Sequence, residues 1–527
     1  MRTQKLIKKI FKKKENIVSG LLLIGIAVFL LMIIVTNVWH FTYRLDADIS
    51  SEVVLAREIW DVKQLVPDTW YISTEARIIG TPNLAALFYG LTHNMVLAMG
   101  LACSVMTVLI TCSMFFFGKS LGLRFQDNLL FLFMGLAVPV LFDFLEMLYL
   151  FAGYYAIHII NLFLTLGVYV TALGEKRINR GIFILSILLA LVLGIQGVRG
   201  ILVFYGPLFG MEVIRNLYRF YCREKADKMD LFVSVWVAAL LALSFIGTLF
   251  PVSVEQEMSK NIRNGFQKLF TIVIPNMGAA IGLQAANPAE KTALIFMLLL
   301  ILYLVLDILW RMCRKQKIEA GEWAFLVICA SPVITALMMA FTTFDTAERY
   351  YFMFTYAMAF AAVLAFGKLR RSHSRRTGMA LGLLLSLSVV VIAVSNLIAI
   401  YVPIINAEEP PQTEDYEIAG YLEENDFHIA YSTFHRANNL TVLSNGKVRS
   451  AAISSMDKMN VSKWLSSSNW YVPNVPYEEK TAYIIPEEEM ESFAKFLETH
   501  GEEMQFETQI GTYFVYSSDY NFSYLED

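Results

Sequence analysis

Long apolar runs separated by short charged segments constrain this chain of 527 residues more than any other feature of its sequence. Most of the runs reach the length of about 20 residues that an α-helix needs to cross the hydrocarbon core of a bilayer. With 56% hydrophobic and only 17% charged residues, the chain is too apolar to be a series of soluble domains. We therefore predict an α-helical polytopic membrane protein with about eleven transmembrane helices. The predicted spans lie near residues 17–40, 91–117, 129–151, 154–174, 182–198, 201–217, 231–250, 291–310, 323–344, 350–367 and 379–402.

The distribution of Lys and Arg predicts the orientation of these spans. Residues 1–16 form a basic tail, and the run after it is too long for a cleavable signal peptide, so we interpret it as a retained signal anchor. If the N-terminus is cytoplasmic, the segments between spans on the inner side of the membrane hold most of the Lys and Arg residues. An odd number of spans then places residues 43–90, residues 251–290 and the C-terminal part outside. The pattern predicts a plasma-membrane protein whose N-terminal lysines contact membrane lipids, and it argues against a nucleic-acid partner.

The composition changes at Pro403, where an acidic linker, NAEEPPQTEDY, follows the last apolar run. The remainder contains strand-like runs, HIAYS, LTVLS, TAYIIP and GTYFVYS, and a helix-like run, EEEMESFAKFLETHG, that ends at Gly501. The dipeptide Asn445-Gly446 is typical of a hairpin turn between LTVLS and KVRSAAI. We therefore predict three parts: the tail 1–16, a transmembrane domain 17–402 with outer loops 43–90 and 251–290, and a small extracytoplasmic α+β domain 403–527.

The segment after the first span, DADISSEVVLAREIWDVK, combines helical periodicity with acidic residues. Its spacing predicts a helix that lies in the outer membrane interface. The mostly apolar stripe of this helix recurs at intervals of four and three residues and consists of Ile49, Val53, Ala56, Trp60 and Lys63.

Three carboxylates lie at the start of this predicted helix. Asp48 and Glu52 are four residues apart and share a face, and Asp46 precedes them in the turn. Carboxylates in this position can act as a general base for an incoming hydroxyl group. Alternatively, Asp48 and Asp46 can be ligands of a divalent cation, Mg²⁺ or Mn²⁺. The alternative is structural, because acids near a helix N-terminus favour the helix dipole.

These residues resemble the first outer loop of the C-type glycosyltransferases, in the branch of the bacterial aminoarabinose transferases and the protein mannosyltransferases. Asp48, the tripeptide ARE at 56–58 and the run PDTWYISTEARIIGTPNLAALFYGL carry the resemblance. It implies a multispan enzyme with the polytopic fold of that family, which takes a sugar from a polyprenyl-phosphate carrier at the outer face. The acid after the first span is then catalytic, as base or metal ligand. Many members have a second acid directly after the first. This chain has Ile49 there, so either Asp46 or Glu52 supplies the second carboxylate, or no residue does.

Two groups of residues near the outer ends of later spans are candidates for binding the donor. Arg199 lies among glycines in GIQGVRG, where a lipid phosphate is a natural partner for its guanidinium group. Alternatively, Arg199 snorkels to the interface from a short turn. Glu348, Arg349 and Tyr350 in FDTAERYYF resemble the Arg-Tyr step of several C-type members, and the alternative is a solvated turn with interfacial aromatic residues.

Polar residues in the third and fourth spans are the remaining candidates. Asp143 and Glu146 are one turn apart in the outer half of the span 129–151, where charged groups are rare without a function. We interpret them as the wall of a polar substrate cavity, with proton conduction as the alternative. His158, with Tyr155 nearby, could line the same cavity or be a hydrogen-bonded structural residue.

Together these patterns favour a glycosyltransferase that moves a hexosyl or pentosyl group from a polyprenyl-phosphate donor to an envelope glycan, lipid or protein by inverting displacement. Asp48 would be the base, assisted by one of the neighbouring acids, and Arg199 and Arg349 would compensate charge on the leaving phosphate. Two alternatives stay open. The chain could be a transporter or lipid flippase that uses the intramembrane acids and Arg199, or a non-catalytic protein of the same fold.

Overall fold

The computed structural model describes residues 2–139, 142–250, 262–343, 346–371, 375–408, 410–411, 413–471 and 480–521. The chain forms two compact units. The bundle unit comprises Met1–Ile33, Met106–Tyr149 and Gly153–Pro403. The mixed unit comprises Ile34–Val105, Leu150–Ala152 and Ile404–Asp527, and it therefore joins the first loop of the chain to the C-terminal part.

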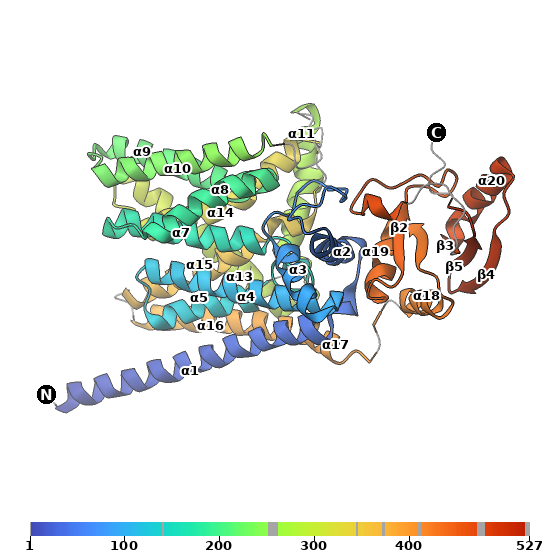
Figure 1. The fold of residues 1–527 in the computed structure, drawn as a ribbon. Helices are drawn as coiled ribbons and strands as arrows, with labels where there is room; N and C mark the ends of the chain where they lie inside the picture. The colour runs from blue at the N-terminus through green and yellow to red at the C-terminus, as the bar shows by residue number, and fades with distance from the viewer. Residues whose placement is uncertain are drawn as a thin grey trace. The chain divides into compact units, whose positions relative to one another are not determined.

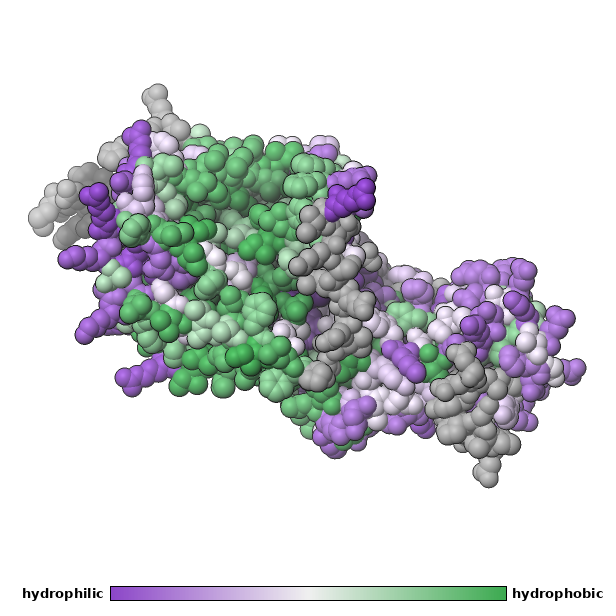
Figure 2. All heavy atoms as spheres, turned by 90° about the horizontal axis from the view of Figure 1, so that it is seen from above, coloured by the Kyte–Doolittle hydropathy of each residue, from purple (hydrophilic) through white to green (hydrophobic). Residues whose placement is uncertain are grey.

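Long apolar helices dominate the chain (Figure 1). Among the described residues, eight helices are long and apolar enough to cross a membrane. Apolar side chains cover most of the visible surface of the bundle helices (Figure 2), as expected for a surface that faces lipid. The predicted polytopic helical architecture is confirmed. The helices in the predicted spans include α1 (Arg2–Trp39), α4 (Met95–Ser120), α5 (Phe125–Ala137), α7 (Ala156–Glu175), α8 (Arg180–Gln196), α9 (Gly206–Cys222), α10 (Lys228–Gly247), α13 (Pro288–Cys313), α14 (Ala320–Phe341), α15 (Met353–Arg371) and α16 (Arg375–Asn396).

Three of the eleven predicted spans differ from a single long helix. The run 129–151 contains α5 and the short α6 (Phe142–Leu148), and residues 140–141 lie outside the described residues. The run 182–198 forms α8, which has only 17 residues. The run 201–217 begins with a π-helical segment, η2 (Ile201–Tyr205), which leads into α9. The number of eleven crossings therefore stays a prediction.

α9 combines buried charges with exposed apolar side chains. Glu212 and Arg215 are only 2% and 5% exposed, whereas Phe220 on the same helix is 84% exposed. Arg215 Nη2 lies 2.7 Å from Glu212 Oε1, and Arg215 Nη1 lies 3.3 Å from Asp230 Oδ1 of α10. Charges that are paired inside the bundle avoid the free-energy cost of facing lipid.

The segment before α13 is helical although proline and glycine interrupt its sequence. α11 (Ile262–Lys268), the π-helical η3 (Leu269–Val273) and α12 (Ile274–Ala280) follow one another. Lys268 Nζ donates to the Thr342 carbonyl at 3.1 Å, and Asn276 Nδ2 donates to the Thr346 carbonyl at 3.1 Å. These bonds attach the segment to the residues that connect α14 to η4 (Glu348–Tyr351). η4 carries three predicted substrate-binding residues, Glu348, Arg349 and Tyr350.

The C-terminal part of the mixed unit is a small domain around a five-stranded sheet of order β2-β1-β3-β5-β4. β1 is parallel to β2 and β3, and β5 is antiparallel to β3 and β4. Leu422, Leu440 and Ile484 belong to its buried apolar core. The predicted C-terminal α+β fold is confirmed. Its elements are α18 (Thr413–Glu424), β1 (Ile429–Thr433), α19 (Phe434–Leu443), β2 (Arg449–Ile453), β3 (Thr481–Pro486), α20 (Met490–His500), β4 (Gln505–Ile510) and β5 (Tyr513–Ser518).

The predicted hairpin at Asn445-Gly446 is wrong. Most of LTVLS belongs to α19 and not to a strand. Asn445 and Gly446, with φ of 50° and 74°, end this helix, and the Gly446 amide donates to the Thr441 carbonyl at 2.7 Å. A helix C-terminus of this kind and a tight hairpin both need left-handed backbone, so the dipeptide alone does not distinguish them.

The predicted place of the first-loop helix at the membrane interface stays a prediction, but its apolar stripe does not face lipid. The helix itself exists as α2 (Ala47–Val62). Its apolar stripe is buried in protein, with Ile49 and Val53 at 0% and 1% exposed. α2 packs against α3 (Thr81–Thr92) and α19 (Figure 1). Apolar periodicity shows that one face is covered, and here protein covers it instead of lipid.

Candidate active site

The first turn of α2 holds the predicted catalytic acid. Asp46 caps the helix, and its Oδ1 accepts a hydrogen bond from the Ile49 amide at 2.7 Å. Asp48 follows in the first turn and is half-buried. A negative charge at this position is also favoured by the helix dipole. Asp46 therefore has a structural role in addition to any chemical one.

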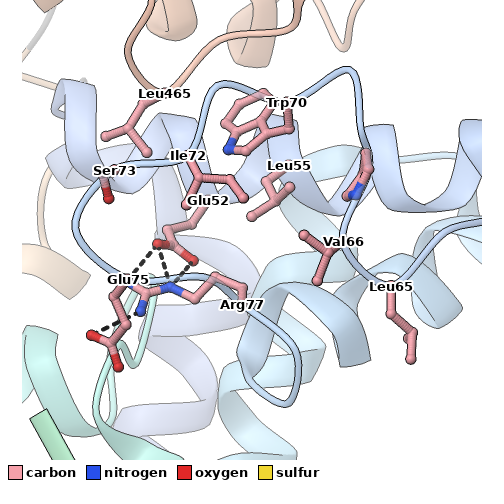
Figure 3. A pocket seen from close by; sticks show the side chains of 11 residues that line it. Glu52, Leu55, Leu65, Val66, Trp70, Ile72, Ser73, Glu75, Arg77 and Leu465 are labelled. Carbon is pink, nitrogen blue, oxygen red and sulfur yellow. Dashed lines mark hydrogen bonds and ion pairs between the residues drawn. The ribbon is translucent and has the colours of Figure 1, made fainter. Parts of the chain in front are cut away.

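Glu52, the third predicted acid, lies one turn further along α2 in an ion-pair cluster (Figure 3). Arg77 Nη2 lies 2.8 Å from Glu52 Oε1, and Arg77 Nη1 lies 3.2 Å from Glu75 Oε2. Arg77 Nε donates to both Glu52 oxygens, at 2.8 and 3.1 Å. One guanidinium group thus bridges two carboxylates, which is the geometry that arginine suits better than lysine.

Burial dominates the electrostatics of Glu52, which is only 5% exposed. Loss of solvation raises the pKa of Glu52 above its ordinary value, and Arg77 opposes this rise. The carboxylates of Glu75 and Asp48 raise the pKa of Glu52 further. Asp48 is therefore close enough to Glu52 for their charges to interact.

A small hollow opens beside this cluster and is walled by the charged side chains, by apolar side chains of the first loop and by the C-terminal domain (Figure 3). Arg77 was not among the predicted site residues. The signal that could have found it is its place two residues after Glu75, in the run that carries the family resemblance. The lining residues are Glu52, Leu55, Leu65, Val66, Pro67, Trp70, Ile72, Ser73, Glu75, Arg77 and Leu465.

The predicted metal ligands do not form a larger cluster. Among the described residues, no group of three or more His, Cys, Asp or Glu side chains is arranged to hold a metal ion. One Asp46 oxygen already accepts the helix-capping hydrogen bond. A divalent cation on Asp48 and Asp46 stays a prediction.

In the bundle unit, the predicted phosphate-binding residues gather around two tyrosines. The guanidinium carbon of Arg199 lies 4.2 Å from the ring centre of Tyr155 and 5.5 Å from that of Tyr350. Arg349 lies 5.9 Å from the same Tyr350 ring. Contacts of this kind attract a cation to the ring face. The fold therefore brings together two arginines and two aromatic rings from three separate segments.

Asp143 and His158, two further predicted site residues, lie next to members of this cluster. α6 carries Asp143 and Glu146 and packs against η4, which carries Glu348. The charges of Asp143 and Glu348 interact. His158 is 3% exposed, and its ring centre lies 6.2 Å from that of Tyr155. Tyr155 thus joins the histidine to the arginine cluster.

The fold is similar to crystal structures of ArnT from Cupriavidus metallidurans. The apo structure matches with a TM-score of 0.56 and 13% sequence identity, over 96% of this chain and 99% of that chain. The structure bound to undecaprenyl phosphate matches with a TM-score of 0.54 and 12% identity, over 97% of this chain and 99% of that chain. No family model matches the sequence, and no curated protein matches it. The chain therefore has an ArnT-like polytopic fold, which agrees with the fold that the resemblance of its first loop implied.

Proposed function

We propose that the protein is a membrane glycosyltransferase that moves a sugar from a polyprenyl-phosphate donor to an acceptor of the cell envelope. The observation that carries this proposal is the ArnT-like fold along nearly the whole chain. One of the similar structures is bound to undecaprenyl phosphate, and a polyprenyl phosphate is what remains of the proposed donor after transfer. We further propose that the transferred group is a hexose or pentose and that transfer takes place at the outer face of the plasma membrane.

Asp48 is the proposed general base. Asp48 lies in the first turn of α2, at the position of the acid that the resemblance makes catalytic. The acceptor hydroxyl gives its proton to the Asp48 carboxylate while its oxygen forms a bond to C1 of the sugar. The bond between C1 and the phosphate oxygen breaks, and its electron pair leaves with the polyprenyl phosphate. Attack opposite the leaving group inverts the configuration at C1.

Arg199 and Arg349 are the proposed electrostatic stabilisers of the leaving phosphate. Their contacts with Tyr155 and Tyr350 hold the guanidinium groups in place before substrate arrives. Preorganised cations lower the barrier because no free energy is spent on orienting them during the reaction. The other predicted substrate-binding residues are proposed to line a polar cavity for the substrate: Asp143, Glu146, His158 and Glu348.

A transfer assay with a matched carboxylate control tests this proposal. Purified protein is incubated with radiolabelled polyprenyl-phosphate sugars and envelope acceptors, and wild type is compared with Asp48→Asn and Asp61→Asn. Asp61 lies on the same helix, half-exposed, in an ion pair with Arg57. We expect Asp48→Asn to lose at least about 100-fold in transfer rate, the size typical of a general base, and Asp61→Asn to keep it. Transfer by Asp48→Asn at the wild-type rate contradicts the mechanism, and no transfer by wild type favours a non-catalytic protein of this fold.

A further inference from the structure

The first turn of α2 is bonded to the C-terminal domain through a buried polar contact. Ser50 Oγ donates to Asn439 Oδ1 of α19 at 2.6 Å, and the two residues are 0% and 4% exposed. Ser50 lies two residues after Asp48 in the same turn. Because a helix turn moves as one body, a bond that fixes Ser50 also fixes the place of Asp48.

Asn439 is in turn held by an ion cluster of the C-terminal domain. Asn439 Nδ2 donates to Asp415 Oδ2 at 3.0 Å, and Asp415 is 3% exposed. Arg436, one turn before Asn439 on α19, pairs with Asp415 and with Glu414, the latter at 3.0 Å. The Arg436 guanidinium carbon lies 3.8 Å from the ring centre of Tyr513. The amide of Asn439 is therefore oriented from both sides, with its nitrogen on Asp415 and its oxygen on Ser50.

Two further contacts fix the second half of α2 to the same domain. Glu58 Oε1 accepts hydrogen bonds from Thr69 at 2.6 Å and from Ser467 at 2.8 Å. Arg57 Nη1 donates to the Gly446 carbonyl at 2.8 Å. α2 is thus attached to the C-terminal domain in its first turn, through Ser50 and Asn439, and in its second half, through Arg57 and Glu58.

We infer that Asn439 is a positioning residue that holds Asp48 in its reactive place through Ser50, so that the C-terminal domain takes part in catalysis by orienting α2. This inference rests on the proposed function of Asp48. It assigns to the C-terminal domain a role for which substrate contact is not required. Replacing Asn439 by Ala removes the hydrogen-bond partner of the buried Ser50 hydroxyl and one partner of the buried Asp415 carboxylate. Loss of these bonds should loosen the first turn of α2.

Hydrogen exchange of the full-length protein tests the structural part without any substrate. The Ile49 and Ser50 amides both donate to Asp46, so their exchange reports opening of the first turn. We expect Asn439→Ala and Ser50→Ala to speed exchange of these amides by on the order of tenfold, and Ser50→Thr, which keeps the hydroxyl, to restore protection. Thr441→Val is the control, because Thr441 lies on α19 and bonds Ser450 of β2. Unchanged exchange in Asn439→Ala, or equal exchange in Thr441→Val, overturns the inference.

Transfer kinetics with a radiolabelled undecaprenyl-phosphate sugar test the catalytic part. We expect Asn439→Ala to lower kcat by on the order of tenfold with little change in the KM for the donor, since a displaced base weakens the chemical step and not donor binding. The double variant Ser50→Ala/Asn439→Ala should be no slower than Asn439→Ala alone, because Asn439→Ala already removes the bond to Ser50. A wild-type kcat together with faster exchange shows that Asn439 holds the helix without positioning Asp48, and this overturns the inference. Absence of transfer by wild type with protection lost in Asn439→Ala instead contradicts the proposed function.

Discussion

Arg77 bridges two buried carboxylates of the first loop, Glu52 and Glu75, and it shows how the charge state of this loop depends on one residue. A buried ion pair gains little over apolar packing, but removal of one partner leaves an uncompensated charge. The sequence places these acids near one another but does not say which of them is paired. The structure shows that Arg77 holds Glu52. The role of general base is proposed for Asp48 because the resemblance makes the acid after the first span catalytic.

Replacing Arg77 by Ala should lower the free energy of unfolding by about 3–5 kcal/mol, the cost typical of a broken buried pair. The control is Lys447→Ala. Lys447 pairs with Glu423 at 2.5 Å, but its side chain is 70% exposed, so its loss should cost less than about 1 kcal/mol. Thermal unfolding of the two variants in the same detergent measures the difference. Equal stability of Arg77→Ala and wild type would show that the cluster does not support the fold.

The raised pKa of Glu52 predicts a pH dependence of stability. In the folded protein Glu52 holds its proton more tightly than in the unfolded chain, where its ordinary value is 4.5. The folded state therefore binds more protons between these two pKa values, and stability falls as the pH rises through this window. Glu52→Gln cannot release a proton, so its unfolding temperature should change less with pH above 4.5 than that of wild type. Identical pH profiles for the two proteins would contradict a raised pKa.

The end of α19 shows how one element positions another. Gly446 has a φ of 74°, which L side chains rarely adopt, and a Cβ atom there would lie 1.4 Å from Arg57 Nη1 of α2. The left-handed turn that ends α19 is therefore also the acceptor for the second half of α2, through the Gly446 carbonyl. A substitution at this turn acts on both helices.

Gly446→Ala should destabilise the protein more than Gly122→Ala does. Both glycines have positive φ, 74° and 68°, but a Cβ at Gly122 would meet nothing within 4 Å. Gly122→Ala thus measures the backbone cost alone, about 1–2 kcal/mol, and the excess in Gly446→Ala measures displacement of Arg57. Thermal unfolding gives both values, and hydrogen exchange of α2 should rise only in Gly446→Ala. An equal effect of the two substitutions would mean that Arg57 moves aside at no cost.

At the scale of the whole molecule, the chain combines helices that are apolar enough for a membrane with a mixed unit that contains the first loop and the C-terminal sheet. The bundle buries ion pairs such as Arg215 with Glu212 and exposes apolar side chains such as Phe220. This inverted distribution is stable only in lipid. The side of the membrane on which the C-terminal domain lies follows from the distribution of Lys and Arg and stays a prediction.

Cysteine labelling in intact cells tests this orientation. A cysteine introduced at the exposed Lys447 should react with a membrane-impermeant maleimide added from outside. The native Cys313, exposed at the end of α13 on the predicted inner side, should react only after the cells are permeabilised. The opposite pattern would place the C-terminal domain inside and would contradict transfer at the outer face.

The sequence alone determined the membrane class, the helical architecture and the C-terminal sheet domain. Runs of about 20 apolar residues follow directly from bilayer thickness, and period-two or period-3.6 patterns follow from the geometry of strands and helices. It also predicted the start of a helix at Asp46 and Asp48, and that helix begins there as α2. These are local properties, so short stretches of sequence contain them.

Only the tertiary structure decided what covers each face and which charges meet. The stripe with Ile49 and Val53 is buried against protein, and Asn445-Gly446 ends a helix, because contacts distant in sequence selected one of two locally equal outcomes. The pairing of Arg77 with Glu52 and the bond from Ser50 to Asn439, 389 residues away, could not be read from spacing. The sequence identified Asp48 as the candidate base, and the fold identified the groups that can hold it in place.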